Sequence, residues 1–228
     1  MEHVDSHENE QNEDPFYKHA AEYWSGIPAT VDGMLGGFGF ISNTDIQGSQ
    51  AFLKQLFKMN EPPGRGHALD CGAGIGRITK HLLIPNFDQV DLVEQDPKFI
   101  SEAKKYIGPT KKIGQLFNQG LQSFDPVPGT YDIIWCQWVL GHLTDKDFVT
   151  FFSGCAKGLK PNGIIVVKEN VTSSDSIEVD EQDSSVTRPL NLLHQLFQQS
   201  RLQCIKEAKQ NNFPRGLYSV KMFALKPV

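Results

Sequence analysis

The fold of this chain is decided by His67-Ala68-Leu69-Asp70-Cys71-Gly72-Ala73-Gly74-Ile75-Gly76-Arg77. The stretch begins as a short apolar strand, passes through glycines at alternate positions, and leads into a helical pattern. A strand, a glycine turn and a helix in this order open an α/β sheet and form a ligand site at the helix N-terminus. A dinucleotide-binding turn would have its third glycine where Arg77 stands. The spacing therefore disfavours a nicotinamide dehydrogenase.

Arg77 indicates a different ligand. A guanidinium group forms two parallel hydrogen bonds with a carboxylate, and a glycine turn leaves backbone N–H groups open. S-adenosylmethionine carries such a carboxylate at its amino acid end, so we interpret the turn as the binding site of this cofactor. The acidic residue Asp70 beside the glycines favours a ligand site over a plain turn.

Strands alternate with helices after the turn, which predicts a mostly parallel sheet with helices on both faces. The predicted parallel strands are His67–Cys71, Val90–Glu94, Ile113–Phe117, Tyr131–Cys136 and Gly163–Val167. The predicted helices contain Ile78 to Leu83, Phe99 to Tyr106 with Asp96 as cap, Phe148 to Phe152 behind a Thr144–Asp147 capping box, and Pro189–Ser200. The runs Leu202–Ala208 and Tyr218–Leu225 predict an antiparallel C-terminal hairpin. This order is typical of the seven-stranded class I S-adenosylmethionine-dependent methyltransferase fold.

The sequence predicts one structural unit with two additions at its start. Residues 1–14 are polar, acidic and without periodicity, and we expect them to be disordered. Residues 15–60 predict a helical extension, interrupted by the glycine-rich segment Ile27–Gly39, which no regular element explains. Residues 61–228 form the predicted methyltransferase domain.

Composition excludes several classes of protein. The chain has 228 residues, 39% of them hydrophobic, and a formal net charge of −5. No apolar run approaches the roughly 20 residues that cross a bilayer, and no secretory signal pattern begins the chain. The acidic balance argues against direct binding of nucleic acid. We expect a monomer without a membrane or nucleic acid partner.

The cysteines indicate a reducing compartment. Cys71, Cys136, Cys155 and Cys204 are scattered, without the paired spacing of a zinc site. We expect Cys71, Cys136 and Cys204, which fall in strand-like stretches, to be small buried hydrophobic residues. No metal is expected, because a sulfonium methyl donor is already activated by its own positive charge.

Polar residues follow the predicted strands at the edge where ligands bind in such sheets. Glu94 ends the second strand, where its carboxylate can accept hydrogen bonds from both hydroxyls of a ribose, and Gln95 and Asp96 follow it. Leu121-Gln122 lies near the expected position of an adenine. Gln137, after the fourth strand, can reach the amino acid end of the cofactor.

The same edge carries candidates for the chemistry. Trp138 and His142 follow the fourth strand, and Asn170 ends the fifth. His142 is equally consistent with a role in the chemistry and with a structural role as a capping or half-buried histidine. The acidic run Asp180–Ser185 is either a solvated surface or a wall that binds a cationic substrate. An amine must lose a proton before it can accept a methyl group, and a histidine or an aspartate can take that proton.

Several segments together resemble one family, the eukaryotic protein N-terminal methyltransferases that act on Xaa-Pro-Lys N-termini. These segments are Thr30–Gly37, Ala68–Lys80, Gln137–Asp145 and Pro161–Ile165. The resemblance runs from about Phe16 to the end. It departs from the family at the serine-rich loop Val171–Val179 and at Arg215-Gly216, where an acidic pair is expected.

The resemblance implies a role for each matching position. The implied S-adenosylmethionine contacts are Gly72, Arg77, Glu94, Gln95, Asp96, Leu121, Gln122 and Gln137. The implied catalytic set is His142 and Asp183 as proton acceptors, with Asn170 holding the first peptide unit. The implied peptide site is Tyr23, Trp24, Leu35, Ile41, Trp138, Asp180, Ser185 and Leu217, with the segment Met34–Gly39 as a lid. The family also implies a location in the nucleus and cytoplasm, and S-adenosylhomocysteine as the spent cofactor.

Two other functions remain open from the residues alone. The glycine turn is also compatible with a small-molecule N- or O-methyltransferase. A catalytically idle module that binds protein N-termini would carry the same cofactor and peptide residues.

Overall fold

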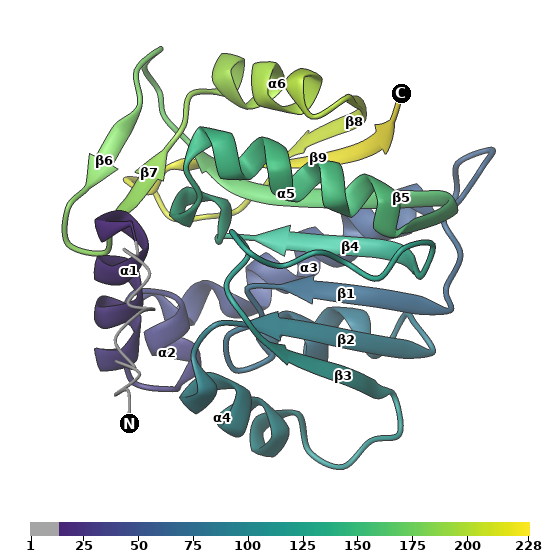
Figure 1. Ribbon diagram of the computed structural model, residues 1–228, viewed down its shortest axis with the longest axis horizontal. Helices are drawn as coiled ribbons and strands as arrows, with labels where there is room; N and C mark the ends of the chain where they lie inside the picture. Colours follow the sequence, from purple (N-terminus) through teal and green to yellow (C-terminus); the bar gives the residue numbers. More distant parts are fainter. Residues whose placement is uncertain (1–13) are drawn as a thin grey trace, which may run out of the picture.

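The structure is a computed structural model that describes residues 14–228 (Figure 1). The disorder expected for residues 1–14 concerns positions outside the described residues, except for Asp14. The Asp14 carboxylate accepts a hydrogen bond from Phe16 N and caps the first helix.

A seven-stranded sheet forms the centre of the molecule, in the order β3-β2-β1-β4-β5-β9-β8. Its strands are β1 His67–Cys71, β2 Gln89–Glu94, β3 Ile113–Asn118, β4 Tyr131–Gln137, β5 Leu159–Val171, β8 Leu202–Lys209 and β9 Ser219–Pro227. β1 to β5 pair in parallel, and β9 runs antiparallel to both β5 and β8. The predicted parallel sheet with an antiparallel C-terminal hairpin is confirmed.

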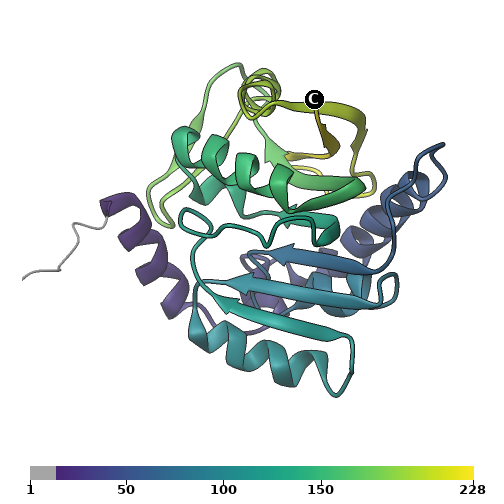
Figure 2. The ribbon, with the colours of Figure 1, turned by 45° about the vertical axis from the view of Figure 1, so that its right-hand side comes forward.

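Helices cover both faces of this sheet (Figures 1 and 2). The longer ones are α1 Pro15–Gly26, α3 Ser42–Leu56, α4 Pro97–Ile107, α5 Asp145–Gly158 and α6 Leu190–Gln199. α5 and α6 pack on one face around Phe148, Phe152 and Phe197. α3 packs on the other face, where Phe52 and Leu53 meet alternate residues of the same strands. Every residue of β4 is buried, as expected for a central strand covered on both sides.

The glycine turn after β1 has the conformation that its sequence requires. Gly72, Gly74 and Gly76 have φ values of 67°, 54° and 78°, in the left-handed region that favours glycine. A Cβ on Gly72 would lie 2.4 Å from Val139 Cγ2. A larger residue at this position would therefore be strained and would also collide with the loop after β4.

The helix predicted after this turn is present, and its marker residues Ile78, Leu82 and Leu83 are buried in the core. It continues from its first helical residues as a π-helical turn, η2 Thr79–Leu83. The wide turn is closed by the hydrogen bond from Ile84 N to Thr79 O, and the Asn86 side chain then donates to Leu82 O at 2.6 Å. These contacts end the segment before a regular helix can continue toward β2.

Two segments are more ordered than their sequences predicted. The glycine-rich segment contains the short helix α2 Val31–Met34 and leads into the 3₁₀ turn η1 Gly39–Ile41. The acidic run forms part of a hairpin between β6 Glu178–Asp180 and β7 Ser185–Thr187. The sequence did not predict β6 and β7, because both strands are short and largely polar.

The cysteine expectation is met at two of its three positions. Cys71 and Cys136 are buried in β1 and β4, whereas Cys204 lies half-buried in the edge strand β8. All four cysteines are free. None of the helices within residues 14–228 combines the length and apolar character needed to cross a membrane.

Candidate active site

A cavity lies at the carboxyl ends of β1, β2 and β4, at the edge where the sequence predicted a ligand. Seven of the eight predicted cofactor residues line it: Gly72, Arg77, Glu94, Gln95, Leu121, Gln122 and Gln137. The predicted aromatic and catalytic residues Trp24, Trp138 and His142 complete its wall. Asp96 does not line the cavity, because its side chain accepts a hydrogen bond from Lys98 N and caps α4. Residues 14–228 contain no cluster of three or more His, Cys, Asp or Glu side chains arranged for a metal ion.

Glu94 is held rigidly at the cavity wall. Its Oε2 accepts from Gly74 N and its Oε1 accepts from Asp96 N, both at 2.9 Å. Burial raises the pKa of Glu94, and these two hydrogen bonds oppose that rise. Each carboxylate oxygen keeps further acceptor capacity, so the group suits a pair of neighbouring hydroxyls.

Asp70 fixes the other side of the glycine turn. Its Oδ2 accepts from Thr79 N at 3.0 Å and from Thr79 Oγ1 at 2.6 Å. Burial raises the pKa of Asp70 to about 7, although these hydrogen bonds favour its charged form. The side chain therefore ties the end of β1 to η2 and holds the turn between them.

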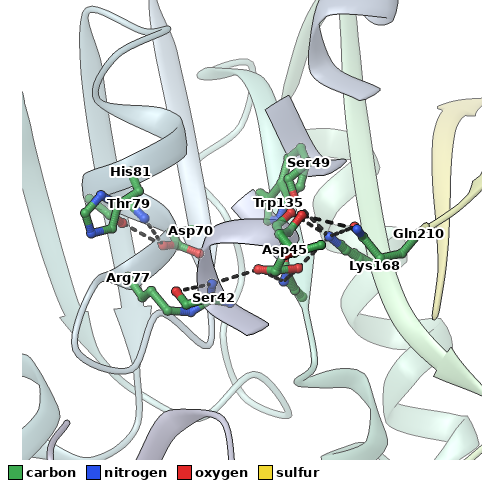
Figure 3. A network of polar contacts seen from close by, with 12 residues as sticks. Ser42, Asp45, Ser49, Asp70, Arg77, Thr79, His81, Trp135, Lys168 and Gln210 are labelled. Carbon is green, nitrogen blue, oxygen red and sulfur yellow. Dashed lines mark hydrogen bonds and ion pairs between the residues drawn. The ribbon is translucent and has the colours of Figure 1, made fainter. Parts of the chain in front are cut away.

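Arg77 already has a carboxylate partner within the protein, which the sequence did not reveal. Its Nη1 lies 2.7 Å from Asp45 Oδ2 (Figure 3). The Gln137 amide, expected to reach a cofactor, donates to both oxygens of Asp45 at 2.9 Å. Asp45 is fully buried in the first turn of α3. Nothing in its polar surroundings, Ser42–Gly48, signals that burial.

An aromatic wall connects the cavity to the outer residues of the predicted peptide site. Trp24 Nε1 donates to His142 Nε2 at 3.0 Å, and Trp138 Nε1 donates to Asn170 Oδ1 at 3.1 Å. The Trp138 ring also lies 6.4 Å from the ring of Phe213. Phe213 follows β8 in a loop that had no sequence signal for the site.

Two buried polar atoms beside this wall have no hydrogen-bond partner among the described residues, namely His142 Nδ1 and Asp183 Oδ1. An indole N–H can only donate, so His142 Nε2 accepts from Trp24, and a neutral ring carries its proton on Nδ1. Burial lowers the pKa of His142, while the nearby charge of Asp183 acts in the opposite direction. Asp183 Oδ1 is thus a buried acceptor that no donor of the described residues satisfies, although Asp183 does not line the cavity itself.

The remaining predicted peptide residues lie outside the cavity lining. Burial raises the pKa of Tyr23, and the charges of Asp183 and Asp180 act in the same direction. Asp180 is exposed, Ser185 and Leu217 are half-buried, and Leu35 and Ile41 are buried. The β6–β7 hairpin, which carries Asp180 and Asp183, lies beside α1 (Figures 1 and 2).

Two further buried charges hold the loop that carries Trp138 and His142. Glu169 Oε1 accepts from Val139 N at 2.9 Å and from Leu140 N at 2.8 Å. Arg188 donates to Leu140 O and Leu143 O from the other side, at 2.8 and 2.6 Å. The available sequence signal was the charged pair Lys168-Glu169 within the otherwise apolar run of β5.

Comparisons with known proteins identify a family that this chain matches over most of its length. Residues 12–226 match a family model described as AdoMet dependent proline di-methyltransferase. The alpha N-terminal protein methyltransferase 1 of Drosophila melanogaster is 51% identical over 220 residues, which cover 95% of this chain and 78% of the relative. The N-terminal Xaa-Pro-Lys N-methyltransferase 1 of Xenopus tropicalis is 48% identical over 219 residues, covering 95% of this chain and 97% of the relative.

A solved structure is similar over most of the chain. A SAM-dependent methyltransferase from Leishmania major has a TM-score of 0.88 at 42% identity, covering 92% of this chain and 83% of that one. The likeness confirms the predicted class I methyltransferase fold.

Proposed function

This chain belongs to the AdoMet dependent proline di-methyltransferase family, and we propose that it methylates the α-amino group of proteins whose N-termini read Xaa-Pro-Lys. It is an S-adenosylmethionine-dependent methyltransferase, and its relatives named for Xaa-Pro-Lys support the substrate. The observation that carries the proposal is a pair of buried atoms without partners among the described residues, His142 Nδ1 in the cavity wall and Asp183 Oδ1, whose charge acts on His142.

The cavity residues fit the cofactor. Glu94 has acceptor capacity for the ribose hydroxyls, and Leu121 and Gln122 line the side assigned to the adenine. Arg77, beside the open glycine turn at Gly72, suits the carboxylate. Gln95 and Gln137 complete the set, and Asp96 supports Glu94 through its backbone N–H. When bound, S-adenosylmethionine supplies a methyl group that its sulfonium charge has activated.

The aromatic wall suits a peptide with proline in second place. The rigid proline ring can stack on an indole at a low cost in conformational entropy, and Trp24 and Trp138 both present indoles at the cavity. Asn170, held by Trp138, would bind the first peptide unit. The acidic group of Asp180 and Asp183 suits the lysine in third place, because opposite charges attract at a partly exposed site. Tyr23, Leu35, Ile41, Ser185 and Leu217 would line the path of the peptide, under a lid formed by Met34–Gly39.

Asp183 is the better placed of the two proposed proton acceptors. The Nε2 lone pair of His142 is occupied by Trp24, whereas Asp183 Oδ1 has no hydrogen-bond partner among the described residues. We assign Asp183 to accept the proton of the α-ammonium group and His142 to orient the acceptor and the amine. Aromatic side chains around the nitrogen would exclude water and favour its neutral, nucleophilic form.

Methyl transfer to a short peptide tests the proposal. The protein is incubated with labelled S-adenosylmethionine and a Pro-Pro-Lys peptide, and mass spectrometry locates the added methyl groups. We expect methylation at the α-amino nitrogen, and none on a control peptide with an acetylated N-terminus. Turnover of a small metabolite without peptide methylation would support a small-molecule methyltransferase instead. Tight peptide binding without any product would indicate an idle binding module.

The proposal includes a monomer that acts in the nucleus and cytoplasm. The four free thiols are consistent with a reducing compartment. Imaging of the tagged protein tests the location, and light scattering at several concentrations tests the monomer.

A further inference from the structure

A fully buried lysine lies behind the cavity, and the proposed reaction gives it no role. Lys168, in β5, has no exposed surface, and its Nζ lies 2.5 Å from Asp45 Oδ1 (Figure 3). The same Nζ is 2.9 Å from Ser49 Oγ and 2.7 Å from Gln210 Oε1. A buried charge without function is costly and is often replaceable by apolar residues. Its full set of partners points to a use for the charge.

Lys168 shares the carboxylate that also binds Arg77. Asp45 Oδ1 faces Lys168 and Asp45 Oδ2 faces Arg77 Nη1, at 2.5 and 2.7 Å. The three charged groups therefore sum to one net positive charge when Lys168 is protonated. Without Lys168, Asp45 and Arg77 would form a neutral pair, and Asp45 would compete with any anion approaching Arg77.

The geometry leaves the rest of the Arg77 guanidinium free. Within residues 14–228, its side-chain hydrogen bonds to Asp45 and Ser42 both use Nη1. Arg77 also lines the cavity. Asp45 thus fixes one corner of the planar group, which lowers the entropy lost when its remaining N–H groups bind a ligand.

We propose that Lys168 is a positioning residue that neutralises Asp45, so that Arg77 keeps its positive charge for the carboxylate of the cofactor. The inference rests on the proposed placement of that carboxylate at Arg77. It assigns α3, from the N-terminal extension, and β5 a joint part in binding the cofactor.

The test compares two ligands that differ only in the carboxylate, S-adenosylhomocysteine and decarboxylated S-adenosylhomocysteine. Their Kd values are measured by calorimetry for the wild type and for Lys168→Met, which removes the charge at similar length. We expect Lys168→Met to raise the Kd of S-adenosylhomocysteine at least tenfold. The Kd of the decarboxylated ligand should change less than twofold. If Lys168 had only a structural role, the substitution would raise the Kd of both ligands by the same factor, and that result would overturn the proposal.

A second variant tests the charge balance directly. Asp45→Asn combined with Lys168→Met restores one net positive charge and keeps an oxygen for Arg77 Nη1. We expect this double variant to recover most of the lost affinity for S-adenosylhomocysteine. Affinity no better than that of Lys168→Met alone would contradict the proposal. Gln50→Ala is the matched control, because Gln50 ties the same helix to Asn86 away from the cluster, and the ratio of the two Kd values should stay unchanged.

If Lys168→Met does not fold, the pH dependence of ligand binding by the wild-type protein tests the proposal instead. Burial lowers the pKa of Lys168 to about 8, and the charged groups that face it are Asp45, which raises its pKa, and Arg77, which lowers it further. The preference for the ligand with the carboxylate should fall as the pH rises through that value, and a constant preference would count against the proposal. Failure to methylate the peptide would concern the proposed function alone, since both ligands can bind without a substrate.

Discussion

Trp138 has a backbone φ of 51°, in the left-handed region that bulky residues rarely adopt. Such a conformation costs on the order of 1–3 kcal/mol and persists where surrounding contacts determine it. Here the contacts are Trp138 N to Lys168 O at 3.0 Å and the indole N–H to Asn170. The strain turns the indole out of the line of β4 and into the cavity wall. The residue that directly follows β4 thereby lines the cavity.

Asp183 is the residue whose substitution we expect to lower turnover without weakening the binding of the cofactor. Asp183→Asn keeps the size of the side chain but removes its basicity. The turnover number should fall by a factor of about 100 or more, because a positioned base contributes on that scale, while the Kd of S-adenosylhomocysteine should stay within about twofold of the wild type.

Asp180→Asn is the control for this variant. Asp180 is exposed and is proposed to attract the lysine of the peptide, so its substitution should raise KM for the peptide and leave kcat nearly unchanged. Unchanged turnover in Asp183→Asn would remove Asp183 from the catalytic set.

Among the elements, the 3₁₀ turn η3 Leu140–His142 depends on the two buried charges that hold its ends. Burial raises the pKa of Glu169 to about 7. Because this value lies above that of the unfolded chain, Glu169 contributes stability that is present at low pH and is lost as the pH rises toward 7 and beyond. Protonation on Oε2 leaves Oε1 free to accept from Val139 N and Leu140 N.

Glu169→Gln should therefore change the pH dependence of stability. The free energy of unfolding of the wild type, relative to Glu169→Gln, should fall by at most about 3 kcal/mol between about pH 5 and about pH 8. Urea denaturation at the two pH values measures this difference. The control, Glu102→Gln on the surface of α4, should show no such change. A pH-independent difference for Glu169→Gln would mean that Glu169 does not titrate in this range.

The sequence predicted those elements that depend on residues close to one another along the chain. β4 reads as an apolar run because both its faces are covered, and Asp96 and Thr144 occupy the caps that their side chains favour. The pairing of Asp45 with Lys168 was not predictable, because a salt bridge between α3 and β5 depends on packing and leaves no periodic pattern. The same holds for Phe213, which reaches Trp138 only through the path of its loop.

At the scale of the whole molecule, α1 lies at the edge of the sheet where β1, β2 and β4 end (Figure 1), and it joins two parts of the fold. Near its start, Tyr17 OH donates to Asp147 Oδ2 of α5 at 2.5 Å. At its end, Lys98 Nζ of α4 donates to Ser25 O and Ile27 O at 2.6 and 2.7 Å. Trp24, between these attachments, lines the cavity. The helix thus forms a wall of the site that is held from both sides.

Releasing both attachments should loosen this wall without removing it. In Tyr17→Phe combined with Lys98→Met, we expect faster amide hydrogen exchange in α1 and a KM for the peptide raised by about fivefold or more, since each lost hydrogen bond contributes on the order of 1 kcal/mol. Exchange followed by mass spectrometry measures the first effect and steady-state kinetics the second. Lys104→Met, on the exposed side of α4, serves as control and should change neither. Equal exchange in the variant and the control would show that α1 is held by other contacts.

The three tryptophans of the chain differ in whether they line the cavity. Trp24 and Trp138 line the cavity, whereas Trp135 is fully buried in β4. Ligands that enter the cavity must therefore alter the emission of two of the three intrinsic fluorophores, while the third supplies a constant background. The protein carries its own optical reporter of occupancy, and stopped-flow fluorescence can follow cofactor and peptide arrival without a label.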